Sequence, residues 1–341
     1  MVSQNIETSL GAVIIGRNEG QRLIDSLDSV VQYVPNIVYV DSGSTDGSIE
    51  AARARGVHTT SLDLSKPFTA ARARNAGWRA LKKAAPSIDK VLFVDGDCQV
   101  QTAFVREAIR VLAEDNSVVA VCGYRRERFP EASIYNRVCD VEWRMGGTGE
   151  CSSFGGDVVI RLSALETVGG YNDSVIAAED DELSIRLRRD VGRIVRIREC
   201  STTHDAEMHS FLQWWNRAVR CGYAYAQVGR MHRDLQQARY FTKEENRTLL
   251  WGFAVPAIAV ALSVVHWSAF PVVGGLYLIR FARIVHTSRK GGLAMRDSIA
   301  WGLSCILHHV PAALGVAKCH LDRLRKIRPE IIEYKEERRN S

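Results

Sequence analysis

The sequence lacks the features by which zinc-binding, disulfide-rich and secreted proteins are usually identified. None of its eight cysteines forms a Cys-x-x-Cys pair, so a cysteine-ligated zinc site is not expected. Scattered cysteines in a chain of 341 residues also argue against a disulfide framework and are typical of a reducing, cytosolic environment. Residues 1–8 are polar and contain no apolar core, so we expect no secretory signal there.

The sequence also contains no nucleic-acid-binding motif and no repeat of arginine and aromatic residues, so nucleic acid is not expected as a partner. Its net charge of +6 is mildly basic and favours other anionic partners, such as nucleotides or lipid head groups. With 46% hydrophobic residues, the chain is long enough for a large core and more than one domain.

Short apolar runs alternate with polar loops in the first part of the chain. The runs at 11–15 and 37–40 are each followed by a polar loop and then by apolar residues at helical spacing. This repetition of strand, loop and helix predicts an α/β fold with a parallel sheet. Further strands are predicted at 91–94, 118–124 and 193–198.

Two carboxylates, Asp95 and Asp97, follow the run at 91–94 and would lie at the carboxyl edge of the sheet, where open α/β folds bind ligands. Close like charges are costly unless a cation lies near them, and oxygen ligands suit Mg²⁺ or Mn²⁺. His204, after the last predicted strand, could join Asp97 at the metal or contact a diphosphate. Simpler alternatives stay open: Asp-Gly is a common surface turn, and a single histidine is often structural.

A polar loop, Asp41 to Ser48, follows the second predicted strand. Ser44 or Asp46 could simply cap the next helix, or the amides of the loop could approach a phosphate or ribose. Because the loop contains two acids, a phosphate alone is disfavoured. Asp41 is therefore predicted to accept hydrogen bonds from a base or ribose.

Charged side chains gather on two later helices. Arg72 and Arg74 are two residues apart, so at most one of them is expected to face a given ligand, and either could belong to a solvated basic helix. Four consecutive acids, Glu179 to Glu182, begin another helix, where the helix dipole favours negative charge. Their mutual repulsion would also keep a carboxylate basic enough to accept a proton, as a general base must.

Six motifs follow one another between residues 11 and 210. They are Arg17-Asn18-Glu19, Asp41 to Ser48, Ala73 to Gly77, Asp95-Gly96-Asp97, Gly155-Gly156-Asp157 and Glu179 to Leu183. In this order they closely resemble the motifs of family 2 glycosyltransferases of the membrane-associated bacterial type, which are inverting nucleotide-sugar enzymes. The resemblance implies the GT-A fold, an α/β, Rossmann-like mixed sheet flanked by helices, here followed by a C-terminal hydrophobic helical region.

The resemblance also implies roles for individual residues. Asp180 would be the catalytic base, and Asp97, with His204, would hold Mg²⁺ or Mn²⁺. The nucleotide sugar, expected to be a UDP-sugar, would be bound by Arg17, Asn18, Glu19, Asp41, Ser44, Asp46, Arg74, Asp95 and Asp97. The sugar and the acceptor would lie beside Gly156, Asp157, Glu179 and Asp181.

Two departures from the family pattern bear on function. The usual Pro-x-Tyr-Asn start is here Gly16-Arg17-Asn18, so the contact usually made by the aromatic ring is missing or replaced. The Gln-x-x-Arg-Trp signature of processive synthases is absent, which argues against a polymerising enzyme. Two alternatives stay open, a non-catalytic membrane scaffold that binds sugar nucleotides and a nucleotidyltransferase on a similar sheet. A nucleotidyltransferase would be expected to have a lysine in the loop 16–20, and this loop has none.

Residues 249–279 contain no Asp, Glu, Lys or Arg, and this run exceeds the roughly 18 residues that suggest a membrane span. A hairpin with limbs at 249–265 and 272–284 would return the following basic residues to the cytosol, but its limbs are short for full spans. We therefore predict a re-entrant or monotopic hairpin and an interfacial helix near 299–316. The alternative is a buried helical hairpin of a soluble domain.

The sequence thus predicts a catalytic domain (1–235), a membrane-associating region (236–320) and a charged tail (321–341). We expect attachment to the cytoplasmic face of the cell membrane through about 249–316. A membrane-attached C-terminal region favours a lipid-linked glycan as the acceptor, in cell-envelope or exopolysaccharide synthesis.

Overall fold

The computed structural model describes residues 9–233, 240–264 and 266–333. These residues form two compact units, the first from residues 9–128 and 143–206 and the second from residues 129–142 and 207–333. The boundaries predicted at residues 235 and 320 separate a catalytic domain, a membrane-associating region and a charged tail. This functional division stays a prediction.

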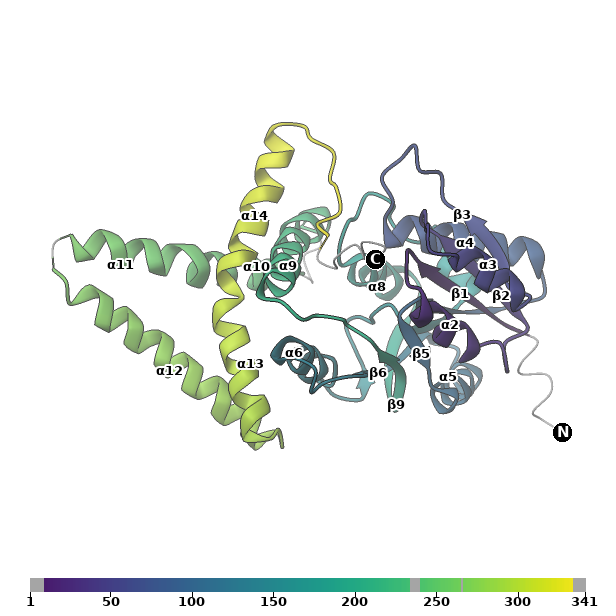
Figure 1. Cartoon of the computed structure of the whole chain (residues 1–341), viewed down its shortest axis with the longest axis horizontal. Coiled ribbons are helices and arrows are strands. Elements are labelled where there is room, and N and C mark those ends of the chain that lie inside the picture. The colour runs from purple at the N-terminus through teal and green to yellow at the C-terminus, as the bar shows by residue number, and fades with distance from the viewer. Residues whose placement is uncertain (1–8, 234–239, 265, 334–341) are drawn as a thin grey trace. The chain divides into compact units, whose positions relative to one another are not determined.

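The first unit is built around a nine-stranded mixed sheet (Figure 1). Its strands are β1 (Leu10–Gly16), β2 (Asn36–Asp41), β3 (His58–Ser61), β4 (Lys90–Asp95), β5 (Cys98–Val100), β6 (Val118–Glu127), β7 (Gly149–Glu150), β8 (Val158–Arg161) and β9 (Arg193–His204). They lie in the order β3-β2-β1-β4-β8-β6-β9-β5, and β7 pairs with β9. The first four strands are parallel, whereas β8 is antiparallel to both of its neighbours. This mixed sheet with flanking helices confirms the predicted fold class.

Helices cover both faces of the sheet, which explains why its central strands are apolar throughout. Phe93 of β4 belongs to a core on one face together with Trp78. The next residue back, Leu92, points to the opposite face and shares a second core with Phe104. The helices of this unit are α2 (Gln21–Asp28), α3 (Ser48–Ala54), α4 (Ala70–Ala84), α5 (Thr102–Glu114), α7 (Leu162–Thr167) and α8 (Glu179–Asp190).

The register of the parallel strands brings the ends of three of them to one edge of the sheet. Gly16 at the end of β1 pairs with Asp41 at the end of β2. Ile15 of β1 pairs with Asp95 at the end of β4. The polar loops after these strands therefore begin side by side, as expected for a ligand-binding edge.

The second unit is helical. It contains α6 (Ile134–Trp143), α9 (Phe211–Met231), α10 (Thr242–Leu249), the π-helical turn η1 (Leu250–Ala254), α11 (Val255–Ser263), α12 (Ala269–Lys290), α13 (Met295–Leu307) and α14 (His309–Leu324). A capping box of Ser210 and Gln213 begins α9. Gly222 of α9 lies against the backbone of Ala312 in α14, where a side chain would overlap the carbonyl group. This close approach packs α9 and α14 together.

The predicted hairpin at 249–284 is present as α11 and α12, whereas the helix predicted at 299–316 is part of a longer stretch. In that stretch α13 ends at Leu307 and α14 begins at His309. Pro311 explains the break, because it has no N–H to donate to the carbonyl of Leu307.

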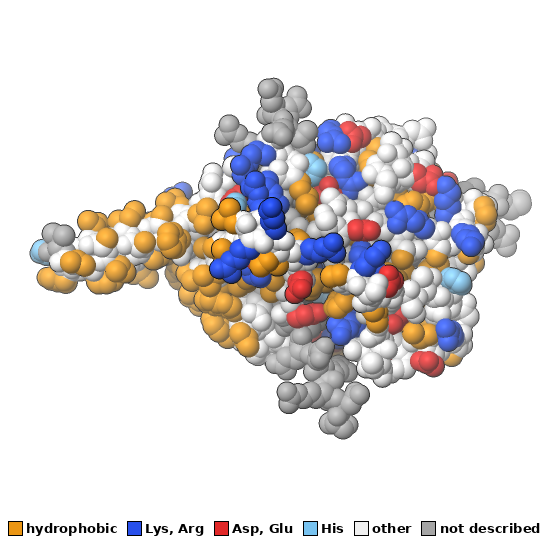
Figure 2. Space-filling view, turned by 90° about the horizontal axis from the view of Figure 1, so that it is seen from above, with side chains coloured by type: hydrophobic (Ala, Val, Ile, Leu, Met, Phe, Trp, Pro, Cys, Tyr) orange, Lys and Arg blue, Asp and Glu red, His pale blue; other side chains and the backbone are white. Residues whose placement is uncertain are grey.

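Apolar side chains are exposed along the α11–α12 hairpin, as Figure 2 shows in orange. Val260 is 58% exposed and Leu278 69%. By length and composition, Thr242–Ser263 and Met295–Leu324 are apolar enough to cross a membrane, and only 11% of the tested window of the first is buried. A buried hairpin of a soluble domain does not match that exposure.

Candidate active site

The loops after β1 and β2 are joined by hydrogen bonds between backbone and side chains. The amide of Asn18 donates to Oγ of Ser44 at 2.9 Å, and Oδ1 of Asn18 accepts from the amide of Thr45 at 2.8 Å. Asp46 accepts from the amide of Gly20 at 2.8 Å and from Oγ of Ser48 at 2.6 Å. Asn18 and Asp46 therefore hold the two loops in one arrangement, a role that the sequence did not reveal.

Asp41 is buried at the end of β2 and turns the chain back on itself. Its Oδ2 accepts hydrogen bonds from the amides of Gly43 and Ser44, both at 2.9 Å. Its Oδ1 accepts from the hydroxyl of Tyr39 at 3.0 Å. The carboxylate is thus oriented by three donors at the edge of the sheet.

Arg74 links the end of β4 to the start of α8. Arg74 is 2% exposed, and its guanidinium group donates to Oδ1 of Asp95 at 2.8 Å and to Oε1 of Glu179 at 2.7 Å. It also lies 3.4 Å from Oδ1 of Asp180 and packs over the ring of Tyr171. Although burial opposes the effect, the guanidinium groups around Asp95 hold the pKa of that carboxyl below its usual value.

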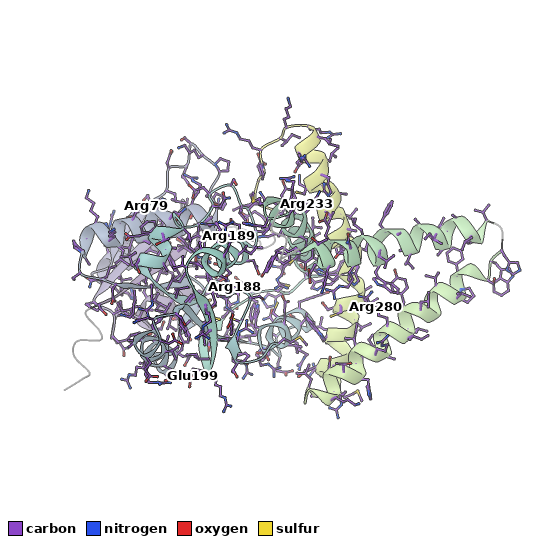
Figure 3. All side chains as sticks on the ribbon, turned by 180° about the vertical axis from the view of Figure 1, so that it is seen from behind. Arg79, Arg188, Arg189, Glu199, Arg233 and Arg280 are labelled. Atoms are coloured by element: carbon purple, nitrogen blue, oxygen red, sulfur yellow. The ribbon has the colours of Figure 1, made fainter. Side chains whose placement is uncertain are left out.

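The carboxyl group of Asp180 is partly buried and lies close to other carboxylates. Burial raises the pKa of its carboxyl well above the usual value. The neighbouring carboxylates of Glu179 and Asp95 act in the same direction, and Arg74 opposes them. The four acids at the start of α8 are balanced at its other end by Arg188 and Arg189, labelled in Figure 3.

A second arginine, Arg125 near the end of β6, belongs to the site although the sequence did not identify it. Its guanidinium group pairs with Asp157 and lies 3.5 Å from Oδ2 of Asp95. Asp157 also accepts hydrogen bonds from the hydroxyls of Ser201 and Thr202. The signal in the sequence was its position directly after the strand predicted at 118–124.

Asp97 and His204 lie together because β5 pairs antiparallel with β9, with Cys98 opposite His204. Nε2 of His204 is 3.0 Å from Oδ2 of Asp97. One ligand atom from each of Asp97, Cys98 and His204 lies within 4.8 Å of the others. The carboxylate and the imidazole fit a divalent ion such as Mn²⁺, whereas the thiol is a softer ligand. The ring of Trp143 packs against that of His204, with the two ring centroids 4.6 Å apart.

Gly156, just before β8, lies against the ion pair of Arg74 and Asp95. A Cβ added to it would lie 2.7 Å from Nη2 of Arg74 and 2.9 Å from Cγ of Asp95. Only a glycine at this position leaves room for the ion pair of Arg74 and Asp95.

Other predicted residues have different surroundings. Arg17 packs over the ring of Phe68, with Cζ 4.7 Å from the ring centroid. Glu19 pairs with Arg22 at 2.7 Å. Arg72 donates to backbone carbonyls of the loop before α4 and not to the acidic cluster of Asp95, Glu179 and Asp180. Asp181 lies next to Asp180 at the start of α8 and is half-buried.

A family model matches part of the chain. Residues 12–153 match the family model described as glycosyl transferase family 2. The succinoglycan biosynthesis protein ExoA of Rhizobium meliloti (strain 1021) is 25% identical over 179 residues, which are 49% of this chain and 53% of ExoA. The chain thus matches about half the length of this curated relative.

A solved structure shows the same fold over most of the chain. The mannosyltransferase PcManGT from Pyrobaculum calidifontis, in complex with GDP-Man and Mn²⁺, is similar with a TM-score of 0.63 and 18% identity. The similarity covers 92% of this chain and 88% of that chain. At this identity the likeness concerns the fold.

Proposed function

Because residues 12–153 match the model of glycosyl transferase family 2, we propose that this chain is a member of that family, an inverting glycosyltransferase that moves a sugar from a nucleotide-diphospho-sugar to an acceptor hydroxyl. One observation carries the proposal. Arg74 joins the carboxylate at the end of β4 to the carboxylates of Glu179, which is buried, and Asp180, which is partly buried. A proton acceptor therefore lies beside the sheet edge at which α/β folds bind ligands.

Asp180 is the general base in this proposal. It accepts the proton of the acceptor hydroxyl while the acceptor oxygen forms a bond to the anomeric carbon. The bond from that carbon to the diphosphate oxygen breaks, and the nucleoside diphosphate leaves with the bonding electrons. Attack opposite the leaving group inverts the anomeric centre. The raised pKa of Asp180 supports this role, because a base with a higher pKa accepts a proton more readily.

The nucleotide sugar, proposed to be a UDP-sugar, would lie along the ends of β1, β2 and β4. Asp41 would accept hydrogen bonds from the base or ribose, beside the loop that contains Ser44 and Asp46. Arg17, Asn18 and Glu19 would line the opposite loop. Arg74, which also donates to Asp95 and Glu179, would approach the diphosphate. The sugar and acceptor would lie beside Gly156, Asp157, Glu179 and Asp181.

Asp97 and His204 would hold a divalent cation, Mg²⁺ or Mn²⁺. When bound, such an ion offsets the negative charge that develops on the departing diphosphate. The short distance between the two side chains supports this assignment, as does the presence of Mn²⁺ in the structure of PcManGT.

The acceptor is proposed to be a lipid-linked glycan, and the enzyme is proposed to act at the cytoplasmic face of the cell membrane in polysaccharide synthesis. The exposed apolar side chains of α11 and α12 support attachment to a membrane. The name of ExoA, a succinoglycan biosynthesis protein, supports the setting.

A panel of nucleotide sugars tests the function, with membrane lipid extract as acceptor and with or without Mn²⁺. We expect release of UDP together with transfer of the sugar to lipid. Release of pyrophosphate would indicate a nucleotidyltransferase. Binding of a nucleotide sugar without transfer of its sugar, for every donor in the panel, would indicate a non-catalytic scaffold.

A further inference from the structure

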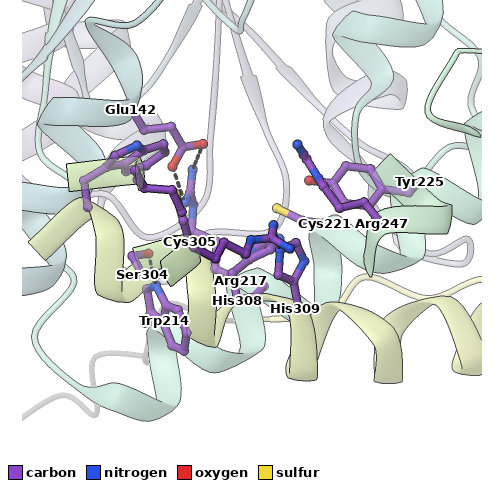
Figure 4. Close-up of a pocket in the computed structure, with 14 residues that line it drawn as sticks. Glu142, Trp214, Arg217, Cys221, Tyr225, Arg247, Ser304, Cys305, His308 and His309 are labelled. Carbon is purple, nitrogen blue, oxygen red and sulfur yellow. Dashed lines mark hydrogen bonds and ion pairs between the residues drawn. The ribbon is translucent and has the colours of Figure 1, made fainter. Parts of the chain in front are cut away.

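The helices of the second unit enclose a cavity that has no part in the proposed proton transfer (Figure 4). Its volume is about 380 Å³. The side chains that line it come from α6, α9, α10, α12, α13 and α14, and they include Glu142, Arg217, Arg247, Arg280, Trp301 and His309.

The lining is positively charged. Glu142 is the one acid among the lining residues, and it accepts hydrogen bonds from both terminal nitrogens of Arg217, at 2.8 and 3.0 Å. Arg247 and Arg280 have no carboxylate partner among the residues that the structure describes. Two guanidinium charges are therefore left without a counter-ion in one cavity.

Arg280 is held in place by uncharged groups. Its Nη2 lies 2.6 Å from Nε2 of His309, and its Cζ lies 4.4 Å from the centroid of the Trp251 ring. Neither contact neutralises the guanidinium group. Guanidinium groups bind phosphate oxygens through paired hydrogen bonds, so an anion with several oxygens suits this site.

The same helices carry exposed apolar side chains. On α12, Leu278 and Ile279 are 69% and 60% exposed and directly precede Arg280. On α13, Leu303 is 44% exposed and directly precedes Ser304, which lines the cavity. A ligand with a charged end and a long apolar chain would satisfy both features.

We propose that this cavity binds the phosphate or diphosphate head group of an anionic lipid, whose apolar chain lies along α12 and α13. As an acceptor site it rests on the proposed function, because a lipid-linked glycan would carry such a head group. Binding of the head group itself does not require glycosyl transfer.

Calorimetric titration of the full chain in dodecyl maltoside micelles tests the proposal. Dodecyl phosphate is the probe, and no nucleotide sugar is present. We expect saturable binding that Arg247→Gln weakens about tenfold, the size of effect expected for a lost charge-assisted hydrogen bond. Arg283→Gln is the matched control, because Arg283 is an exposed arginine of α12 outside the cavity lining. It should change the affinity by less than about twofold.

Several results would overturn the proposal: no saturable binding, equal weakening by Arg283→Gln, or binding of inorganic phosphate as tight as that of dodecyl phosphate. The last would indicate a site for the free anion. If Arg247→Gln does not fold, the wild-type protein decides the matter. It should prefer dodecyl phosphate over zwitterionic dodecylphosphocholine, and equal binding of the two would count against the site. Because the titration contains no donor, failed sugar transfer and failed lipid binding are observed independently.

Discussion

Replacing Arg74 by methionine removes the positive charge at the centre of the acidic cluster while keeping a side chain of similar length. The change leaves the buried carboxylate of Glu179 and the partly buried carboxylates of Asp95 and Asp180 without their shared partner. One such contact between unit charges at 4 Å amounts to about 4 kcal/mol at an effective dielectric constant of 20. Protonation and entry of water offset part of this, and breaking a buried ion pair costs roughly 3–5 kcal/mol in measured cases.

We therefore expect Arg74→Met to lower the unfolding temperature of the first unit by roughly 6–20 °C, at about 2–4 °C per kcal/mol for a unit of this size. Thermal unfolding followed by calorimetry at pH 7 measures the effect. Arg72→Met is the matched control on the same helix. Its guanidinium group donates to loop carbonyls, so we expect a cost of about 1 kcal/mol or less.

The pH dependence supplies a second check. Arg74 helps to hold the pKa of Asp95 below its usual value, so this stabilisation is present above the ordinary range of aspartate and is lost as the pH falls through the lowered value. The carboxylates of the variant, lacking Arg74, take up protons at higher pH than those of the wild type. The difference between the two proteins should therefore be largest near pH 7 and shrink in acid. An Arg74→Met protein as stable as Arg72→Met at pH 7 would refute the bridging role.

Four further predictions concern the reaction and the stability of the site. Asp180→Asn should still bind the nucleotide sugar but lose transfer. It should not lose thermal stability, because the raised pKa of Asp180 means that its negative charge is unfavourable in the folded protein. Wild-type turnover would remove the base assignment. In the wild type, kcat/KM should decrease on acidification at a pH above 3.8, the ordinary pKa of aspartate, because the base has a raised pKa and becomes protonated there. A decrease that begins only at or below pH 3.8 would contradict this. Asp97→Ala should abolish metal-dependent transfer, measured as UDP release, and full wild-type activity in excess chelator would contradict a metal role. Gly156→Ala should destabilise the first unit by about 1–3 kcal/mol through overlap with Arg74 and Asp95, measured by thermal unfolding, and an unchanged unfolding temperature would show that the cluster can move aside.

The sequence by itself determined the strands and the polar residues that end them. Runs such as 91–94 are apolar on every residue, so they form central strands covered on both faces. Because neighbouring strands are parallel, the placement of Asp41 and Asp95 at one edge followed from local patterns alone.

The tertiary structure decided which charged groups meet. Only the packing of α4 on the sheet turns Arg74 inward and Arg72 toward the preceding loop. Arg125 reaches Asp157, and Asp97 reaches His204, across strands that are far apart in the sequence. The order and register of β5, β6, β8 and β9 bring these side chains together. That order and register depend on non-local packing, which no short window of the sequence contains.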